Sequence, residues 1–142
     1  MKKLILIFLY FFTGLTFGDT SVIINVDVNS GKLSTTDIRN IYLMRYNRWP
    51  NGDKVVLFQM TEDTYLFRHF VRDILGMSVE EYNKKWNKMV NSGLGSEVRY
   101  VKTTDEMLRR VSSTRSAIGY IDSDNVIINF GGNDVKVLHI AD

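Results

Sequence analysis

The side chains that most often carry catalysis are sparse in this 142-residue sequence. The two histidines, His69 and His139, lie far apart and in no metal-binding spacing such as H-E-x-x-H. No cysteine is present, which excludes a thiol nucleophile, a disulfide framework and a zinc–thiolate site. No nucleophile elbow, phosphate loop or dinucleotide fingerprint occurs either. The sequence therefore predicts a protein that is not an enzyme, with no cofactor and no metal.

Paired carboxylates are the remaining candidates for acid–base chemistry. Glu62-Asp63 and Glu80-Glu81 are both expected to open helices. Acidic side chains at that place stabilise the positive end of the helix dipole, so a structural role is favoured for both pairs. His69, on an expected helix, and His139, near the C-terminus, are likewise interpreted as structural or surface residues.

The first residues are typical of a secretory signal. Lys2 and Lys3 precede an apolar run over 4–12, and small residues follow. We expect cleavage after Gly18, which leaves a periplasmic or secreted domain of residues 19–142; an uncleaved N-terminal anchor is the alternative. Without Lys2 and Lys3, 16 of the 18 Lys and Arg residues remain and balance the 16 Asp and Glu residues. This balance gives no argument for nucleic acid as a partner.

Hydrophobic periodicity and turn residues predict alternating strands and helices. Helices are expected from Ser34, from about Thr61 to Leu75, from Ser78 and from Thr103, each with a capping residue at its start. Strands are expected at 21–28, 54–59, 96–101, 117–121, 126–130 and 135–140, the last two joined as a hairpin. This order predicts a single α/β domain whose mixed sheet is covered by helices.

Aromatic residues divide into a predicted core and a possible contact surface. Trp86 and Phe67 lie at helical spacing and are interpreted as core. Trp49 stands in a loop before Pro50, where an indole can either pack on the core or face a partner. With Tyr46 and Tyr65, it is a candidate partner-binding residue.

Short motifs follow one another in order over roughly 22–140. They are Ile41-Tyr42-Leu43 at a helix end, Trp49-Pro50-Asn51-Gly52 before a strand, Trp86 on a later helix, the glycine turn at 92–95 and Ala117-Ile118-Gly119-Tyr120. In this combination the sequence resembles the phosphate-type periplasmic substrate-binding proteins of ABC importers, as a small single-domain relative. The resemblance implies one lobe of periplasmic-binding-protein type. Full-length members close two lobes over phosphate, and a single lobe cannot form that enclosed cleft.

The resemblance also implies a site. In the family a helix opens with a Ser-Gly-Thr-like run, often after an arginine, and holds the anion at its N-terminus. In this sequence Gln59 stands near the arginine position and Thr64 matches the serine. With Thr61, interpreted either as a ligand contact or as the helix N-cap, and Gly119, these are the candidate ligand-binding residues.

Two acidic residues stand inside this candidate site. Glu62 and Asp63 would repel an incoming phosphate, at a cost of about 3 kcal/mol for two like charges roughly 5 Å apart at an effective dielectric near 20. A helix terminus favours an anion by only about 0.3–1 kcal/mol. Repulsion therefore wins unless a cation such as Arg68, Arg48 or Lys54 reaches the site.

Two functional hypotheses remain open. In the first, the protein binds phosphate, another small anion or a small polar solute as part of an ABC transport system. In the second, the same fold has lost its ligand and contacts a membrane transporter, a receptor or a sensor kinase through exposed aromatic residues. The loss of the anion motif favours the second hypothesis, and the resemblance favours the first.

Overall fold

The computed structural model describes residues 19–93, 98–124 and 134–138. The expected signal, the expected strand at 126–130 and most of the hairpin turn after it lie outside the described residues. No helix in the described part of the chain is both long and apolar enough to cross a membrane.

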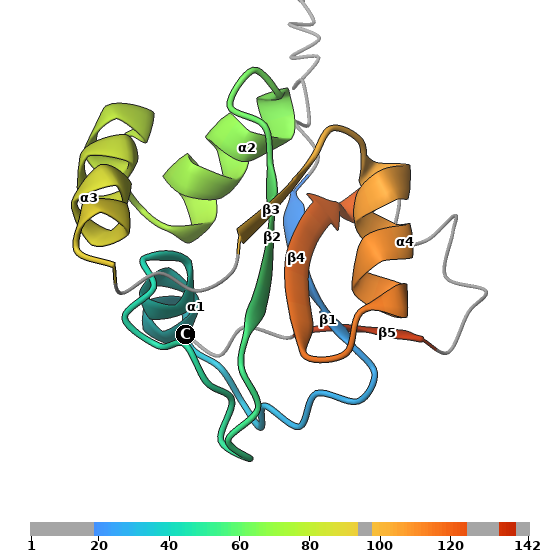
Figure 1. Ribbon diagram of the computed structural model, residues 1–142. Helices are drawn as coiled ribbons and strands as arrows, with labels where there is room; N and C mark the ends of the chain where they lie inside the picture. The colour runs from blue at the N-terminus through green and yellow to red at the C-terminus, as the bar shows by residue number, and fades with distance from the viewer. Residues whose placement is uncertain (1–18, 94–97, 125–133, 139–142) are drawn as a thin grey trace, which may run out of the picture.

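The centre of the molecule is a five-stranded sheet with the strand order β3-β2-β4-β1-β5 (Figure 1). Strand β2 pairs in parallel with β3 and β4, whereas β1 pairs antiparallel with β4 and β5. The strands are β1 (Thr20–Asn25), β2 (Val56–Met60), β3 (Val98–Val101), β4 (Ala117–Asp122) and β5 (Val135–Val137). The sheet is therefore mixed, as the sequence predicts.

Helices cover both faces of this sheet. Three of them lie on one face, and α4 (Thr104–Ser113) lies on the other (Figure 1). The three are α1 (Thr35–Tyr42), α2 (Tyr65–His69), which continues into the π-helical segment η1 (Phe70–Ile74), and α3 (Val79–Asn91). The predicted α/β class is confirmed.

Capping residues fix where the helices begin. The cap expected at Ser34 is confirmed and is a full capping box, because the Ser34 hydroxyl accepts from the Asp37 N–H and the Asp37 carboxylate accepts from the Ser34 N–H. The expected start of the second helix at Thr61 is wrong. Thr61, Glu62 and Asp63 form a turn, and Thr64 is the N-cap of α2. Glu62 and Asp63 therefore precede the helix instead of lying in its first turn.

The core lies between the sheet and the helices on each face. Tyr120 of β4 stacks on Phe70, with ring centroids 3.8 Å apart, and Tyr42 of α1 packs edge-on against both rings. On the other face, a Cβ at Gly119 would lie 2.5 Å from Met107 Sδ, so α4 approaches the sheet closely. Both faces of the sheet are covered, so β2 and β4 are buried along almost their whole length and are mostly apolar.

Candidate functional site

The parallel strands β2, β3 and β4 end at the same edge of the sheet, at the top of Figure 1, and α2 and α4 begin there. We call this the carboxyl edge. The Thr61 N–H donates to Val101 O at 3.0 Å and joins the ends of β2 and β3. The Ser123 N–H donates to Asp19 O at 2.7 Å beside the end of β4. The edge is where ligands bind in open α/β sheets, and it holds Thr61 and Thr64.

The hydroxyl of Thr64 is used within the protein. It donates to Thr61 O at 2.7 Å and accepts from the Phe67 N–H at 3.2 Å. Thr61 Oγ1 is buried and makes no hydrogen bond of full geometry with the described residues. The Thr61 hydroxyl is nevertheless the largest of the causes that hold the pKa of the Asp63 carboxyl below its ordinary value.

Gln59 lies in the core below this edge. Its side chain is 3% exposed, and Oε1 accepts a hydrogen bond from the Tyr82 hydroxyl at 2.7 Å. Burial raises the pKa of Tyr82 well above its ordinary value, so the phenol remains a neutral donor. The amide oxygen of Gln59 therefore ties β2 to α3, and it lies away from the surface.

Gly119 lies on the face of the sheet opposite to α2. It stands inside β4, in register with Ile23, and its Cα faces Met107 and Val111 of α4. The structure does not bring Gly119 together with Thr61 and Thr64. The missing side chain lets α4 approach the sheet, a packing role that its place in an apolar strand did not reveal.

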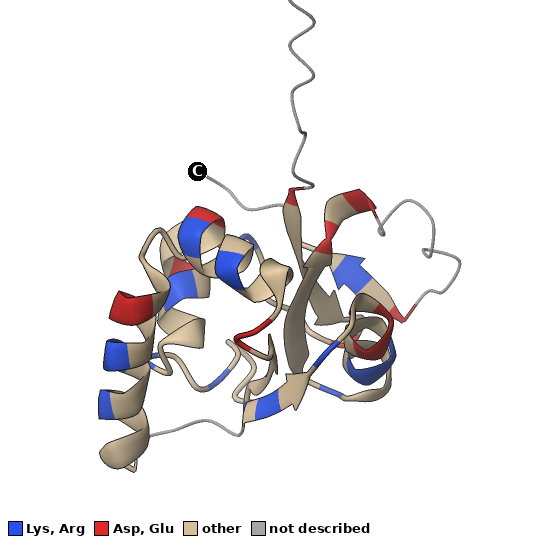
Figure 2. Cartoon of the chain, turned by 90° about the horizontal axis from the view of Figure 1, so that it is seen from above, with Lys and Arg blue, Asp and Glu red and all other residues tan. Residues whose placement is uncertain are grey.

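Negative charge gathers at the carboxyl edge. Figure 2 looks down on this end of the molecule and shows red segments around the ends of the central strands. Glu62 and Asp63 follow β2, Asp105 and Glu106 open α4, and further carboxylates flank the end of β4 and the start of β1: Asp19, Asp122 and Asp124.

Few cations offset this charge. Lys102 and Arg68 are close enough to lower the pKa of Asp63. Arg48 and Lys54 are paired by a backbone β-bridge in the hairpin before β2. This hairpin lies at the opposite end of the strand, roughly 20 Å from the carboxyl edge at ~3.3 Å per residue. The two cations cannot supply the charge that an anion would need at that edge.

The aromatic residues proposed for a partner surface separate into two groups. Trp49 is 4% exposed, and its indole N–H donates to Ser116 O at 2.9 Å, which fixes the hairpin onto the start of β4. Tyr46 and Tyr65 are about half exposed, at 49% and 44%. Only these two of the three candidates are on the surface.

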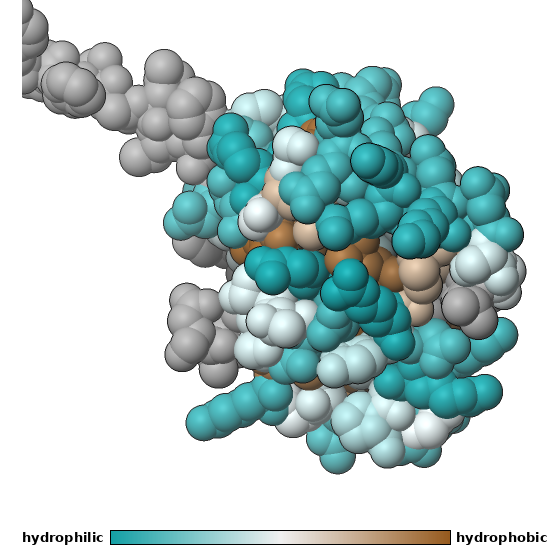
Figure 3. Space-filling model, turned by 90° about the vertical axis from the view of Figure 1, so that its left-hand side faces the viewer, coloured by the Kyte–Doolittle hydropathy of each residue, from teal (hydrophilic) through white to brown (hydrophobic). Residues whose placement is uncertain are grey.

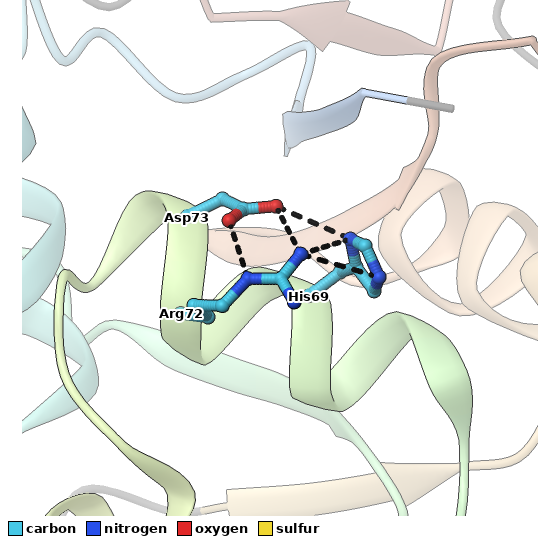
Figure 4. Close-up of polar contacts among 3 residues, drawn as sticks. All are labelled: His69, Arg72 and Asp73. Atoms are coloured by element: carbon cyan, nitrogen blue, oxygen red, sulfur yellow. Dashed lines mark hydrogen bonds and ion pairs between the residues drawn. The ribbon is translucent and has the colours of Figure 1, made fainter. Parts of the chain in front are cut away.

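His69 forms a polar cluster with two neighbours on the same helical segment (Figure 4). The His69 Nδ1 atom lies 3.2 Å from Asp73 Oδ2. An Arg72 guanidinium nitrogen lies 3.1 Å from His69 Nδ1. The Arg72 guanidinium holds the pKa of Asp73 below its ordinary value. Tyr65 lies against the imidazole with a centroid distance of 3.9 Å. These contacts agree with the interpretation of His69 as a structural residue.

The sequence reasoning missed two features of the charge distribution. One is the acidic carboxyl edge, which required knowing that β2, β3 and β4 end together. The other is a pair of arginines, Arg68 and Arg72, which stand four residues apart on α2 and η1 beside a hollow in the surface. That spacing was a visible signal, because residues four apart share one face of a helix.

Neither a protein-family model nor a curated protein matches the chain. Solved structures do match it. A phosphate ABC transporter substrate-binding protein with bound phosphate from Clostridium perfringens has a TM-score of 0.63 and 16% identity, with 87% of this chain and 45% of that chain covered. PstS from Borrelia burgdorferi has a TM-score of 0.64 and 13% identity, with 87% and 47% covered.

An ABC-type phosphate transport receptor from Vibrio cholerae is similar to the same degree. Its TM-score is 0.64 at 11% identity, with 87% of this chain and 46% of that chain covered. The chain thus has the α/β fold found in phosphate substrate-binding proteins. It spans about half the length of the structures that it matches.

Proposed function

We propose that this chain is a non-enzymatic binding protein that contacts a protein partner and does not retain free phosphate tightly. One observation carries the proposal: the carboxyl edge is acidic, and the Thr64 hydroxyl and the Gln59 amide oxygen, both expected to hold an anion, make hydrogen bonds within the protein itself. The expected signal over the first 18 residues supports a location in the periplasm or outside the cell. The protein's partner would be a membrane transporter, a receptor or a sensor kinase.

A second candidate is supported by the fold. Two helices begin at the carboxyl edge, and one similar structure holds phosphate. In this version the protein binds a small anion or small polar solute near Thr61 and Thr64 for an ABC transporter. The first candidate is favoured because Glu62 and Asp63 lie directly before the N-cap of α2 and would repel an anion at that helix end.

Thermal unfolding with phosphate and sulfate at low salt tests the choice. A ligand present at about a hundred times its Kd adds about 2.7 kcal/mol, which shifts the midpoint by several degrees in a domain of this size. We expect no shift. A shift with phosphate that Thr64→Ala abolishes, while Thr64→Ser keeps it, would contradict the proposal and favour the solute-binding version.

The double variant Glu62→Gln/Asp63→Asn is the matched test of the electrostatic argument. It keeps the shape of the turn and removes two negative charges. If charge alone blocks the site, phosphate stabilises this variant and not the parent. If neither protein responds, the edge lacks the donors for an anion irrespective of charge.

A further inference from the structure

Two hollows meet on the face formed by α1, η1 and α3. One has a volume of about 630 Å³ and lies beside Arg68, Arg72 and Val79. The other, of about 280 Å³, lies beside Arg39, Arg45 and Lys85. They share Gly76, Met77 and Glu81, so they adjoin at the turn between η1 and α3. We call the two hollows together the basic groove.

The groove is rimmed mostly by positive charge. Arg39, Arg45, Arg68, Arg72 and Lys85 line it, and Glu81 is the acidic residue among the described lining residues. Glu81 is opposed by Lys85, with 3.8 Å between Nζ and Oε1, and Asp73 is held by Arg72 at 2.9 Å. The groove therefore retains excess positive charge, although the chain after residue 18 is electrically balanced.

Arg39 has a fixed position in the groove. Its Nε donates to Leu75 O at 2.7 Å, and its terminal nitrogen packs 3.0 Å from where a Gly76 Cβ would stand. Gly76 has a φ of +66°, a conformation that suits glycine. A guanidinium held in place loses little freedom on binding a carboxylate, and its fork matches carboxylate geometry.

The floor of the groove is apolar. Leu43 is 2% exposed, and Met77 and Val79 are partly buried against the core. Figure 3 shows this side of the molecule, with a strip of hydrophobic surface that has hydrophilic side chains on both sides. An apolar floor between charged rims fits a chain whose side chains alternate between apolar and acidic.

We propose that the basic groove docks an acidic peptide segment of a partner protein, with apolar side chains on Met77 and Val79 and carboxylates on the arginines. The inference rests on the proposed function only in taking a protein as the partner. It concerns a surface that shares Arg68 with the carboxyl edge and is otherwise lined by other residues. The apolar floor between the charged residues and the Glu81 carboxylate in the wall favour a peptide with apolar side chains over an anionic membrane surface.

Fluorescence anisotropy tests this with a labelled peptide pool in which Asp or Glu alternates with Leu or Phe. A pool with Asn or Gln at the acidic positions is the matched control probe. We expect saturable binding of the acidic pool, weakened by salt because the charges are exposed to solvent. Equal binding of both pools, or no binding of the acidic pool, would overturn the proposal.

Charge reversal locates the contact. Arg45→Glu/Arg68→Glu, at two exposed positions, should weaken binding about tenfold or more. Arg109→Glu/Arg110→Glu makes the same charge change on exposed positions of α4, on the other face of the sheet, and should leave binding unchanged. An equal loss in both variants would show non-specific attraction and overturn the proposal.

Two further probes separate the alternative occupants. Vesicles that contain anionic lipid should bind no better than neutral vesicles, and inorganic phosphate should not displace the peptide beyond its effect as salt. Preferential binding of anionic vesicles, or displacement by phosphate at low concentration, would overturn the peptide proposal. If the acidic peptide binds and phosphate does not shift the unfolding midpoint, the peptide proposal is supported and the solute-binding version of the function is not.

Discussion

At the residue scale, polar side chains that look available in the sequence hold elements together in the structure. Gln59 accepts from Tyr82, and Asn25 donates to Val111 O and Ser112 O at the end of α4. Both residues are at least 96% buried. A buried polar group stabilises a fold only while its partner is present, because an unpaired one bears the full desolvation cost.

The Tyr82–Gln59 contact gives a direct test of that principle. Tyr82→Phe removes the donor at 2.7 Å and leaves Gln59 Oε1 buried without it. We expect the free energy of unfolding to fall by about 1–3 kcal/mol in urea titration. Tyr82→Phe/Gln59→Leu removes both partners and should recover part of that loss. A double variant as unstable as the sum of its single variants would contradict the pairing.

Gly119 supplies a second test. Gly119→Ala places a methyl 2.5 Å from Met107 Sδ and 2.9 Å from Val111 Cγ2. We expect a loss of about 1–3 kcal/mol from overpacking, measured by thermal or urea unfolding. Combining it with Met107→Ala relieves the nearer contact, so the two changes should cost less together than their sum. Simple additivity would show that α4 does not approach the sheet this closely.

At the element scale, the helix starts follow from local rules and were largely predictable. Ser34, Ser78 and Thr103 cap α1, α3 and α4, as their sequence patterns indicate. The start of α2 was not predictable in the same way, because QMTEDT contains two hydroxyl candidates. In the structure Thr61 lies in a turn and Thr64 is the N-cap, so Glu62 and Asp63 lie outside the helix.

The N-cap of α2 can be measured through stability. Thr64→Ala removes the acceptor for the Phe67 N–H and should lower the free energy of unfolding by about 0.5–2 kcal/mol. Thr64→Ser keeps the hydroxyl and should cost much less. Urea unfolding of the two variants provides the comparison. If serine were no better than alanine, the hydroxyl would not be the stabilising group.

At the scale of the whole molecule, the candidate site was less predictable than the fold. The mixed α/β class follows from the order of periodic segments, each of which is a local signal. The site depends on which strand ends meet and on which face each residue lies. Gly119, Arg48 and Lys54 were expected near the anion site. In the structure Gly119 faces α4, and the two cations lie in the hairpin before β2, at the other end of the strand from Thr64.

Acid should destabilise the whole protein through its hydrogen-bonded carboxylates. The pKa of Asp37 is lowered by the Ser34 N–H and hydroxyl, that of Asp63 mainly by the Thr61 hydroxyl, and that of Asp73 mainly by Arg72. A folded-state pKa below the unfolded value of about 3.9 gives stability that is present above that pH and lost as the pH falls below it. Urea midpoints should therefore decline below about pH 4.

Asp37→Asn tests one contribution to this acid sensitivity. It should lower stability at neutral pH and flatten the decline below about pH 4, because the amide does not titrate. Asp27→Asn, at an exposed aspartate, is the matched control and should keep the slope of the parent. An unchanged slope in Asp37→Asn would mean that other carboxylates account for acid unfolding.

The place of β1 in the sheet has a consequence for the order of folding. This strand is the first to be synthesised among the described residues, yet both of its neighbours, β4 and β5, lie roughly a hundred residues later in the chain. Contacts across such separations form slowly, because a long loop must close before they stabilise anything. The ribosome adds about 5–20 residues per second, so the sheet lacks its middle for several seconds of synthesis. During that time β1 has neither of its sheet neighbours, so its unpaired edges are open to contacts outside the native fold.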